Sequence, residues 1–189
     1  LAISSAASDV YKRQFIIMAS ELRVDKIIPY DGVPSGGGGG IIQVKMGTLT
    51  SVFTTTSSTM VDTGLSVSIT PKFTTSKVLV IVSLGSFQNG GRLKRAMMNI
   101  VRNSTNVIVG DNRTGIECTA CVCVRAADDN YAQIPLAFTA LDSPATTSAV
   151  TYKVQATRGS DSQTVYLNGN QGGDAYSGNT CLLYTSDAA

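Results

Sequence analysis

The sequence predicts an all-β protein: an antiparallel β-sandwich, jelly-roll-like, with an extended N-terminal arm. After residue 40, apolar and polar residues alternate with a period of two in one segment after another. Turn residues separate these segments at intervals of about 8–12 residues, which gives about eight to ten short strands. Charged residues make up only 15% of the 189 residues, well below the roughly 25% of average proteins. No segment carries a convincing helical period.

The first half of the predicted sandwich holds three strands. Ile42, Val44 and Met46 alternate with polar residues, and so do Leu65, Val67 and Ile69 before Pro71 ends the run. The segment 77–84, Lys-Val-Leu-Val-Ile-Val-Ser-Leu, is apolar on both faces. It is therefore predicted to be a central strand buried on both sides.

The second half continues the pattern. A hairpin is predicted from residues 98–102 through the turn Asn103-Ser104-Thr105-Asn106 to residues 107–109. Cys121 and Cys123 would share one face of a strand with Thr119. Val150, Tyr152, Val154 and Ala156 alternate with polar residues, and residues 158–161 turn the chain into a last segment, 164–167.

Both ends of the chain are predicted to lie outside the fold. Back-translation of residues 4–14 gives a DNA sequence whose reverse complement encodes residues 181–189, Cys-Leu-Leu-Tyr-Thr-Ser-Asp-Ala-Ala. That DNA resembles the transposon-end adapter of sequencing libraries, so residues 1–17 and 181–189 are interpreted as adapter scars with flanking translation. Met18 is then the expected start, the sandwich domain spans residues 41–180, and its last natural strand is expected to be missing.

Residues 18–40 are predicted to form an arm and a hinge. Apolar residues stand between charges in the arm, as in an isolated extended strand, over the segment Leu22, Arg23, Val24, Asp25, Lys26 and Ile27. Five glycines follow, whose backbone entropy favours a flexible hinge: Gly36, Gly37, Gly38, Gly39 and Gly40. A phosphate-binding loop would need Lys and Ser or Thr next, where Ile41 and Ile42 stand.

Composition excludes several kinds of function. The absence of His rules out His-based catalytic triads and His-ligated metals. A net charge of +2 argues against nucleic acid as a partner, and no apolar run approaches the roughly 20 residues of a membrane span. No cofactor is therefore expected.

Three smaller clusters have ordinary structural interpretations. Cys118, Cys121 and Cys123 lack the fourth ligand of a structural zinc site and are predicted to pack in the core; no metal site is expected. The basic cluster Arg92, Lys94 and Arg95 has no interleaved aromatic residues, so a solvated loop or a protected strand edge is favoured. Asp128-Asp129-Asn130 lacks the spacing of a calcium loop and is predicted to be a turn.

Asp62-Thr63-Gly64 is the most enzyme-like motif. It resembles the Asp-Thr-Gly turn of retroviral-type aspartic proteases, and Val107-Ile108-Val109-Gly110 resembles their second apolar element. Such enzymes pair two carboxylates across a dimer so that one stays protonated. The favoured alternative is a simple turn before the strand that begins near Leu65. No catalytic residue is therefore assigned.

Several segments together carry a family resemblance. They are residues 18–27, the glycine hinge, 64–71 (Gly-Leu-Ser-Val-Ser-Ile-Thr-Pro), 141–144, 150–155 and 164–168. In combination they resemble tail-fibre or virion-appendage structural proteins of marine tailed bacteriophages. The resemblance implies an arm that docks to the virion and a β domain that projects outward, commonly as a trimer. Its relatives end with one more apolar strand, where residues 181–189 stand here.

The leading hypothesis from the sequence is thus a non-enzymatic virion component, assembled in the bacterial cytoplasm as a homotrimer. Its expected partners are other virion proteins and, outside the particle, a glycan or protein of the host surface. Exposed polar loops such as Gln88–Arg92 and Asp128–Tyr131 are the expected contact sites. The alternatives are a free-standing carbohydrate- or protein-binding sandwich and, more remotely, the aspartic protease through Asp62.

Overall fold

The computed structural model describes residues 41–89, 95–110, 122–125, 133–158, 162–170 and 181–188. The chain divides into two units, Leu1–Gly37 and Gly38–Ala189, and every described residue belongs to the second. The predicted docking arm (residues 22–27) and the predicted glycine hinge (residues 36–40) lie outside the described residues.

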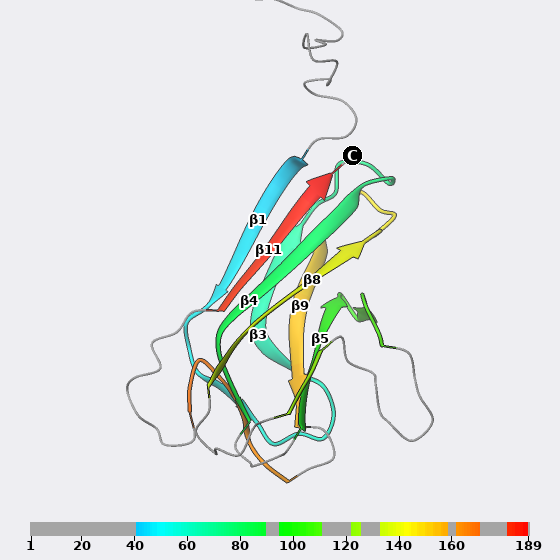
Figure 1. The fold of residues 1–189 in the computed structure, drawn as a ribbon. Coiled ribbons are helices and arrows are strands. Elements are labelled where there is room, and N and C mark those ends of the chain that lie inside the picture. Colours follow the sequence, from blue (N-terminus) through cyan, green and yellow to red (C-terminus); the bar gives the residue numbers. More distant parts are fainter. Residues whose placement is uncertain are drawn as a thin grey trace, which may run out of the picture. The chain divides into compact units, whose positions relative to one another are not determined.

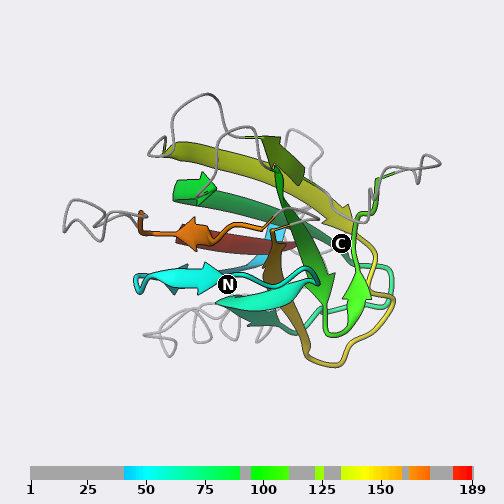
Figure 2. The same ribbon diagram turned by 90° about the horizontal axis from the view of Figure 1, so that it is seen from below.

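The described part is all-β, with two antiparallel sheets packed together as a sandwich, as predicted (Figure 1). The first sheet has the order β1-β11-β4-β10-β2, with β8 also paired to β4. Its strands are β1 (Ile41–Leu49), β2 (Phe53–Thr55), β4 (Lys77–Asn89), β8 (Ile134–Asp142), β10 (Val165–Leu167) and β11 (Cys181–Ala188). Figure 2 shows β8, β4, β10 and β2 side by side in this layer.

The second sheet has the order β3-β9-β5-β6, with β7 also paired to β5. Its strands are β3 (Val61–Ile69), β5 (Arg95–Arg102), β6 (Thr105–Asn106), β7 (Val122–Arg125) and β9 (Val150–Thr157). The predicted hairpin is confirmed in β5 and the start of its turn, where Asn103 adopts a φ of 54°, but its return was misplaced: the returning strand is β6 (Thr105–Asn106), predicted to be turn, and residues 107–109 form no strand. Asn103 and Thr151 of β9 hold this turn by two hydrogen bonds, Asn103 N to Thr151 O and Thr151 N to Asn103 Oδ1.

The core lies between the sheets and follows the alternation of the sequence. On β3, Leu65, Val67 and Ile69 are buried and their polar neighbours are exposed. The other strands contribute the rest of the buried cluster, which includes Val78, Val80, Val82, Leu84, Phe87, Met98, Ile100, Tyr152, Val154, Val165, Leu167 and Leu183. Burying one face of each strand supplies the main hydrophobic stabilisation of the sandwich.

The predicted central strand is central but is not buried on both sides. In β4 the residues from Val78 to Leu84 alternate between full burial and exposure, and Leu79 and Ile81 face outward. A two-layer sandwich covers only the inner face of each sheet, so no described residue packs over the second apolar face of β4. The prediction was wrong on this point.

The end of the chain also departs from expectation. Residues 181–188, set aside as an adapter scar, form β11 and lie between β1 and β4, hydrogen-bonded to both. The position of the strand expected to be missing is therefore filled, because the alternation of Leu183 with Leu182 and Tyr184 fits a strand with one buried face. The adapter origin of these residues stays a prediction.

A polar clamp joins the two sheets. Asp142, at the end of β8, accepts hydrogen bonds at Oδ2 from Arg102 Nη1 of β5 and from the hydroxyl of Tyr152 of β9 at 2.6 Å. Tyr152 is fully buried. Burial raises the pKa of the Tyr152 phenol above its ordinary value of 10, and the neighbouring Asp142 carboxylate raises it further. The phenol thus stays a hydrogen-bond donor throughout the physiological range.

Candidate interaction surface

The most unusual surface of the described chain is the solvent-facing side of β1, β11, β4 and β8. Directly paired residues of an antiparallel sheet share a face, so the strand register defines this surface. One row runs Val44, Ser186, Leu79, Leu141, and the next runs Met46, Tyr184, Ile81, Thr139. The third row is Thr48, Leu182, Ser83, Ala137. We call these three rows the apolar outer face.

The aliphatic side chains of this face are well exposed. Leu141 is 64% exposed, Val44 57%, Met46 55%, and Leu79 and Ile81 38% each. Four strands about 4.8 Å apart and three rows about 7 Å apart cover on the order of 400 Å², a footprint that includes four Ser and Thr positions. An apolar patch within such a footprint is comparable to the largest patch on a typical monomer, which is often functional.

Charge is kept to the border of the apolar outer face. None of the twelve residues in its three rows is charged. Lys77 precedes the first row on β4, and its Nζ donates a hydrogen bond to Ser143 Oγ at 2.6 Å. An apolar centre with a polar border is the usual composition of a protein–protein interface.

The edge strand β1 carries a feature that opposes uncontrolled sheet extension. Lys45 pairs with Thr185 of β11, at a register position facing the interior side of the sheet, yet it is exposed. An inward-directed lysine on an edge strand is a known protection against edge-to-edge pairing. This arrangement favours association through the sheet face over association through the edge.

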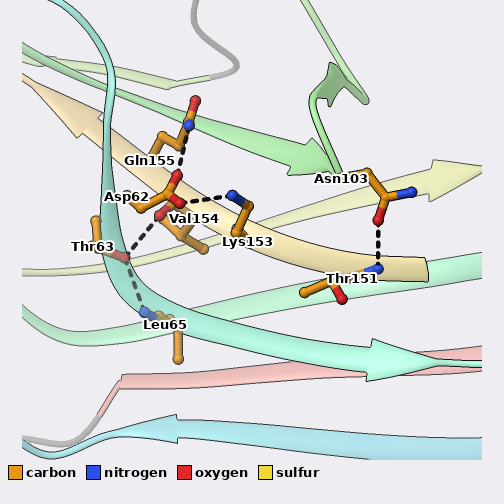
Figure 3. A network of polar contacts seen from close by, with 8 residues as sticks. All are labelled: Asp62, Thr63, Leu65, Asn103, Thr151, Lys153, Val154 and Gln155. Carbon is orange, nitrogen blue, oxygen red and sulfur yellow. Dashed lines mark hydrogen bonds and ion pairs between the residues drawn. The ribbon is translucent and has the colours of Figure 1, made fainter. Parts of the chain in front are cut away.

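Asp62-Thr63-Gly64, the motif considered for a protease, lies inside β3 rather than in a turn before it (Figure 3). The register shifts between Asp62 and Ser66, and Gly64 has a φ of 89°, as in a β-bulge. The Thr63 hydroxyl donates to Val154 O at 2.8 Å and accepts from Leu65 N at 3.2 Å. The motif therefore bends β3, while the hydrogen bond from Thr63 to Val154 keeps β3 attached to β9.

Asp62 itself is engaged by two donors of β9. Lys153 Nζ lies 2.7 Å from Oδ2, and Gln155 Nε2 lies 2.7 Å from Oδ1 (Figure 3). The hydrogen bonds from Lys153 and Gln155 lower the pKa of Asp62 below its ordinary value of 3.8. Both contacts favour the ionised carboxylate, whereas an aspartic protease needs a carboxylate that shares a proton.

We expect Asp62→Asn to lower the free energy of unfolding at pH 7 by no more than about 0.5 kcal/mol, because the pair with Lys153 is half exposed. The folded-state pKa lies below the unfolded one, so this contribution is complete above about pH 5 and is lost as the pH falls through 3.8 and below. Urea unfolding of both proteins from pH 7 to pH 2.5 measures it, and Lys153→Met serves as the matched control. A difference in the free energy of unfolding between the two proteins that grows toward low pH would contradict a lowered pKa for Asp62.

The remaining predicted sites are only partly within the described residues. Cys123 lies in β7 opposite Met97, while Cys118 and Cys121 lie outside. Arg95 begins β5 opposite Arg125, while Arg92 and Lys94 lie outside, as do Asp128–Tyr131. Gln88 was predicted in an exposed loop; it is buried in β4 opposite Tyr166, because β4 extends to Asn89.

The described part of the chain holds no group of three or more His, Cys, Asp or Glu side chains that could bind a metal ion. Nor do these residues form a helix with the length and hydropathy needed to cross a membrane.

Comparison with known proteins adds no assignment. No protein-family model matches the chain, and no curated protein matches it significantly. The class that the described residues define is a two-sheet antiparallel β-sandwich with an uncovered apolar sheet face.

Proposed function

We propose that the protein is a non-enzymatic structural subunit of a bacteriophage virion, a tail-fibre or appendage component that assembles as a homotrimer. The observation that carries this proposal is the apolar outer face, which the described residues leave uncovered. A protein whose product is a rigid assembly needs such a face, and an isolated enzyme or ligand-binding domain does not. The resemblance of residues 18–27, 64–71 and 150–155 to phage appendage proteins supports the virion as the assembly.

We further propose that the sandwich is a jelly roll. Leaving out the short β2, β6 and β10, the eight other strands in chain order give the arrangements 1-8-3-6 in one sheet and 2-7-4-5 in the other. Two Greek keys folded into two four-stranded sheets have this order. Jelly rolls are common in viral coat proteins and in lectins, so the topology supports the first two hypotheses from the sequence over the protease.

In the proposed trimer the apolar outer faces of three subunits pack around a three-fold axis. Each face would contact both of the others, so that Leu79, Ile81 and Leu141 leave water in every subunit. Removing the apolar surface of these side chains from water would stabilise the trimer by about 25 cal/mol per Å². The loops at the ends of the sandwich would stay free for a host-surface glycan or protein.

We expect light scattering on a sizing column to give a mass about three times the 19.8 kDa of one chain. The double variant Leu79→Lys, Leu141→Lys places two cations on the apolar outer face and should weaken association roughly 100-fold or more, leaving monomers. Val109→Lys is the control, since Val109 is 50% exposed and lies outside the three rows. It should leave the trimer intact, and circular dichroism should show the same β content in all three proteins.

The other outcomes contradict the proposal in different ways. A monomeric wild-type chain would favour a free-standing binding module, which glycan and protein binding assays would then identify. A dimer with peptide-cleaving activity that Asp62→Asn abolishes would favour the protease. A trimer that persists in the Leu79→Lys, Leu141→Lys variant would place the interface elsewhere. The virion assignment itself fails if peptides of this chain are absent from purified particles of the phage that encodes it.

A further inference from the structure

The place of β11 in the first sheet suggests a second interaction site, independent of the apolar outer face. All eight residues of β11 pair with β4, from Cys181 opposite Leu84 to Ala188 opposite Lys77. On the other side they pair with β1 along nearly its whole length. β11 is the sole strand that joins β1 to the rest of this sheet among the described residues. The space between β1 and β4 is thus a slot for one strand.

The inner side of this slot is apolar along β4, whereas β1 places Gly47, Lys45 and Gln43 opposite the same three positions. Three residues of β11 face the core, Leu183, Thr185 and Asp187, and each is 0% exposed. Their partners on β4 are Val82, Val80 and Val78, which are also fully buried. Such surroundings favour three aliphatic side chains at alternate positions of the strand.

β11 supplies one aliphatic side chain and two polar ones. Thr185 Oγ1 and Asp187 Oδ1 are buried and make no hydrogen bond. Asp187 Oδ2 accepts a single hydrogen bond, from Lys72 N at 2.8 Å. A buried carboxylate with one partner and a buried hydroxyl with none are strongly unfavourable. The backbone of β11 therefore fits the slot, whereas two of its three inward side chains do not.

We propose that the slot between β1 and β4 is a strand-acceptor site, whose preferred occupant is an extended segment of another polypeptide with aliphatic residues at the three inward positions. Main-chain hydrogen bonds to the two flanking strands would provide affinity, and the inward valines of β4 would provide specificity. β11 occupies the site here, and a strand with better-matched inward side chains can displace it.

The test uses the full chain and a fluorescent eight-residue peptide that copies residues 181–188 with C181S, T185V and D187V. The control peptide carries C181S alone. We expect the aliphatic peptide to bind one per chain in an anisotropy titration, and the control peptide to bind at least tenfold more weakly. Hydrogen exchange should increase within residues 181–188 of the chain on binding, while β4 stays protected. Equal binding of the two peptides, no binding, or unchanged exchange in β11 would each overturn the proposal.

A chain variant separates this slot from the apolar outer face. In the full chain, T185V with D187V should raise the melting temperature by roughly 3 °C, because the loss of the unpartnered Thr185 hydroxyl and Asp187 Oδ1 outweighs the loss of the one hydrogen bond that Asp187 Oδ2 accepts from Lys72 N. The variant should also bind the aliphatic peptide at least tenfold more weakly than the wild-type chain does, since its own β11 matches the slot. Undiminished binding would mean that the peptide lies on the outer face, and an unchanged or lower melting temperature would show that β11 already fits; either result overturns the proposal.

Discussion

Asp142→Ala is expected to lower the free energy of unfolding by about 2–4 kcal/mol, because it removes the shared acceptor of the clamp between the sheets. Asp142 and Arg102 expose only 12% and 21% of their side chains. Without the carboxylate, the guanidinium of Arg102 and the buried hydroxyl of Tyr152 would both lose their acceptor. Leaving buried donors unpaired costs more than the intact interaction contributes. The melting temperature of a domain of this size should fall by about 10 °C.

Urea unfolding of Asp142→Ala beside Asp62→Ala measures this effect against a matched control. Both variants remove an aspartate that is paired with a cation on another strand, but Asp62 is on the surface with a side chain 48% exposed. The control should change stability by no more than about 0.5 kcal/mol. Removing the donors as well, in the triple variant with Arg102→Met and Tyr152→Phe, should recover part of the loss. Equal losses for the two single variants would show that the clamp does not hold the sheets together.

The fold class could be predicted from the sequence because a sandwich buries one face of each strand. The alternation of Leu65, Val67 and Ile69 appears unchanged as the burial pattern of β3, and that of residues 150–156 as the pattern of β9. Asn103 adopts the positive φ that a tight turn requires and that Asn tolerates. These are local signals, and each is readable within a single strand or turn.

Besides β6, which was assigned to the turn, three strands were missed for reasons that are not local. β8 contains Pro135, which cannot donate to a ladder; it is tolerated here because β8 pairs only with β4. β2 has three residues, too few to show a period. β11 was set aside because of its DNA-level match to residues 4–14, yet backbone hydrogen bonding in a sheet does not depend on where a segment comes from.

The sequence predicts only part of the apolar outer face. The segment 77–84 is apolar on both faces, which correctly marks Leu79 and Ile81 as residues that need covering. The sequence cannot say that Val44, Met46 and Leu141 lie beside them, because those residues come from strands 35 positions before and 62 positions after them along the chain. Conversely, Asp62-Thr63-Gly64 resembles a catalytic motif in the sequence. In the structure it forms a β-bulge, and Asp62 is hydrogen-bonded to Lys153 and Gln155 of β9.

Gly47→Ala is expected to lower the free energy of unfolding by about 3 kcal/mol, because β1 passes too close to β3 for any side chain at this position. A Cβ on Gly47 would lie 2.1 Å from the backbone oxygen of Ser66 and 3.2 Å from Val67 Cβ. A backbone oxygen within a strand cannot rotate away, so one strand must move. At a position with room, a Gly→Ala change commonly raises the free energy of unfolding by about 0.4–1 kcal/mol, because it lowers the conformational entropy of the unfolded chain. A decrease in stability would therefore by itself distinguish crowding from this ordinary effect.

Gly64→Ala is the control that separates crowding from backbone conformation. A Cβ there would meet only Leu49 Cδ1 at 3.5 Å, an ordinary contact, but the φ of 89° would strain an alanine by about 1 kcal/mol. Because β1 carries Val44 and Met46, its displacement in Gly47→Ala should also weaken self-association, whereas Gly64→Ala should leave association unchanged. Urea unfolding and light scattering of the two variants test both statements. A Gly47→Ala chain as stable as the wild type would mean that the two sheets do not meet as closely at this corner as the contact between Gly47 and Ser66 requires.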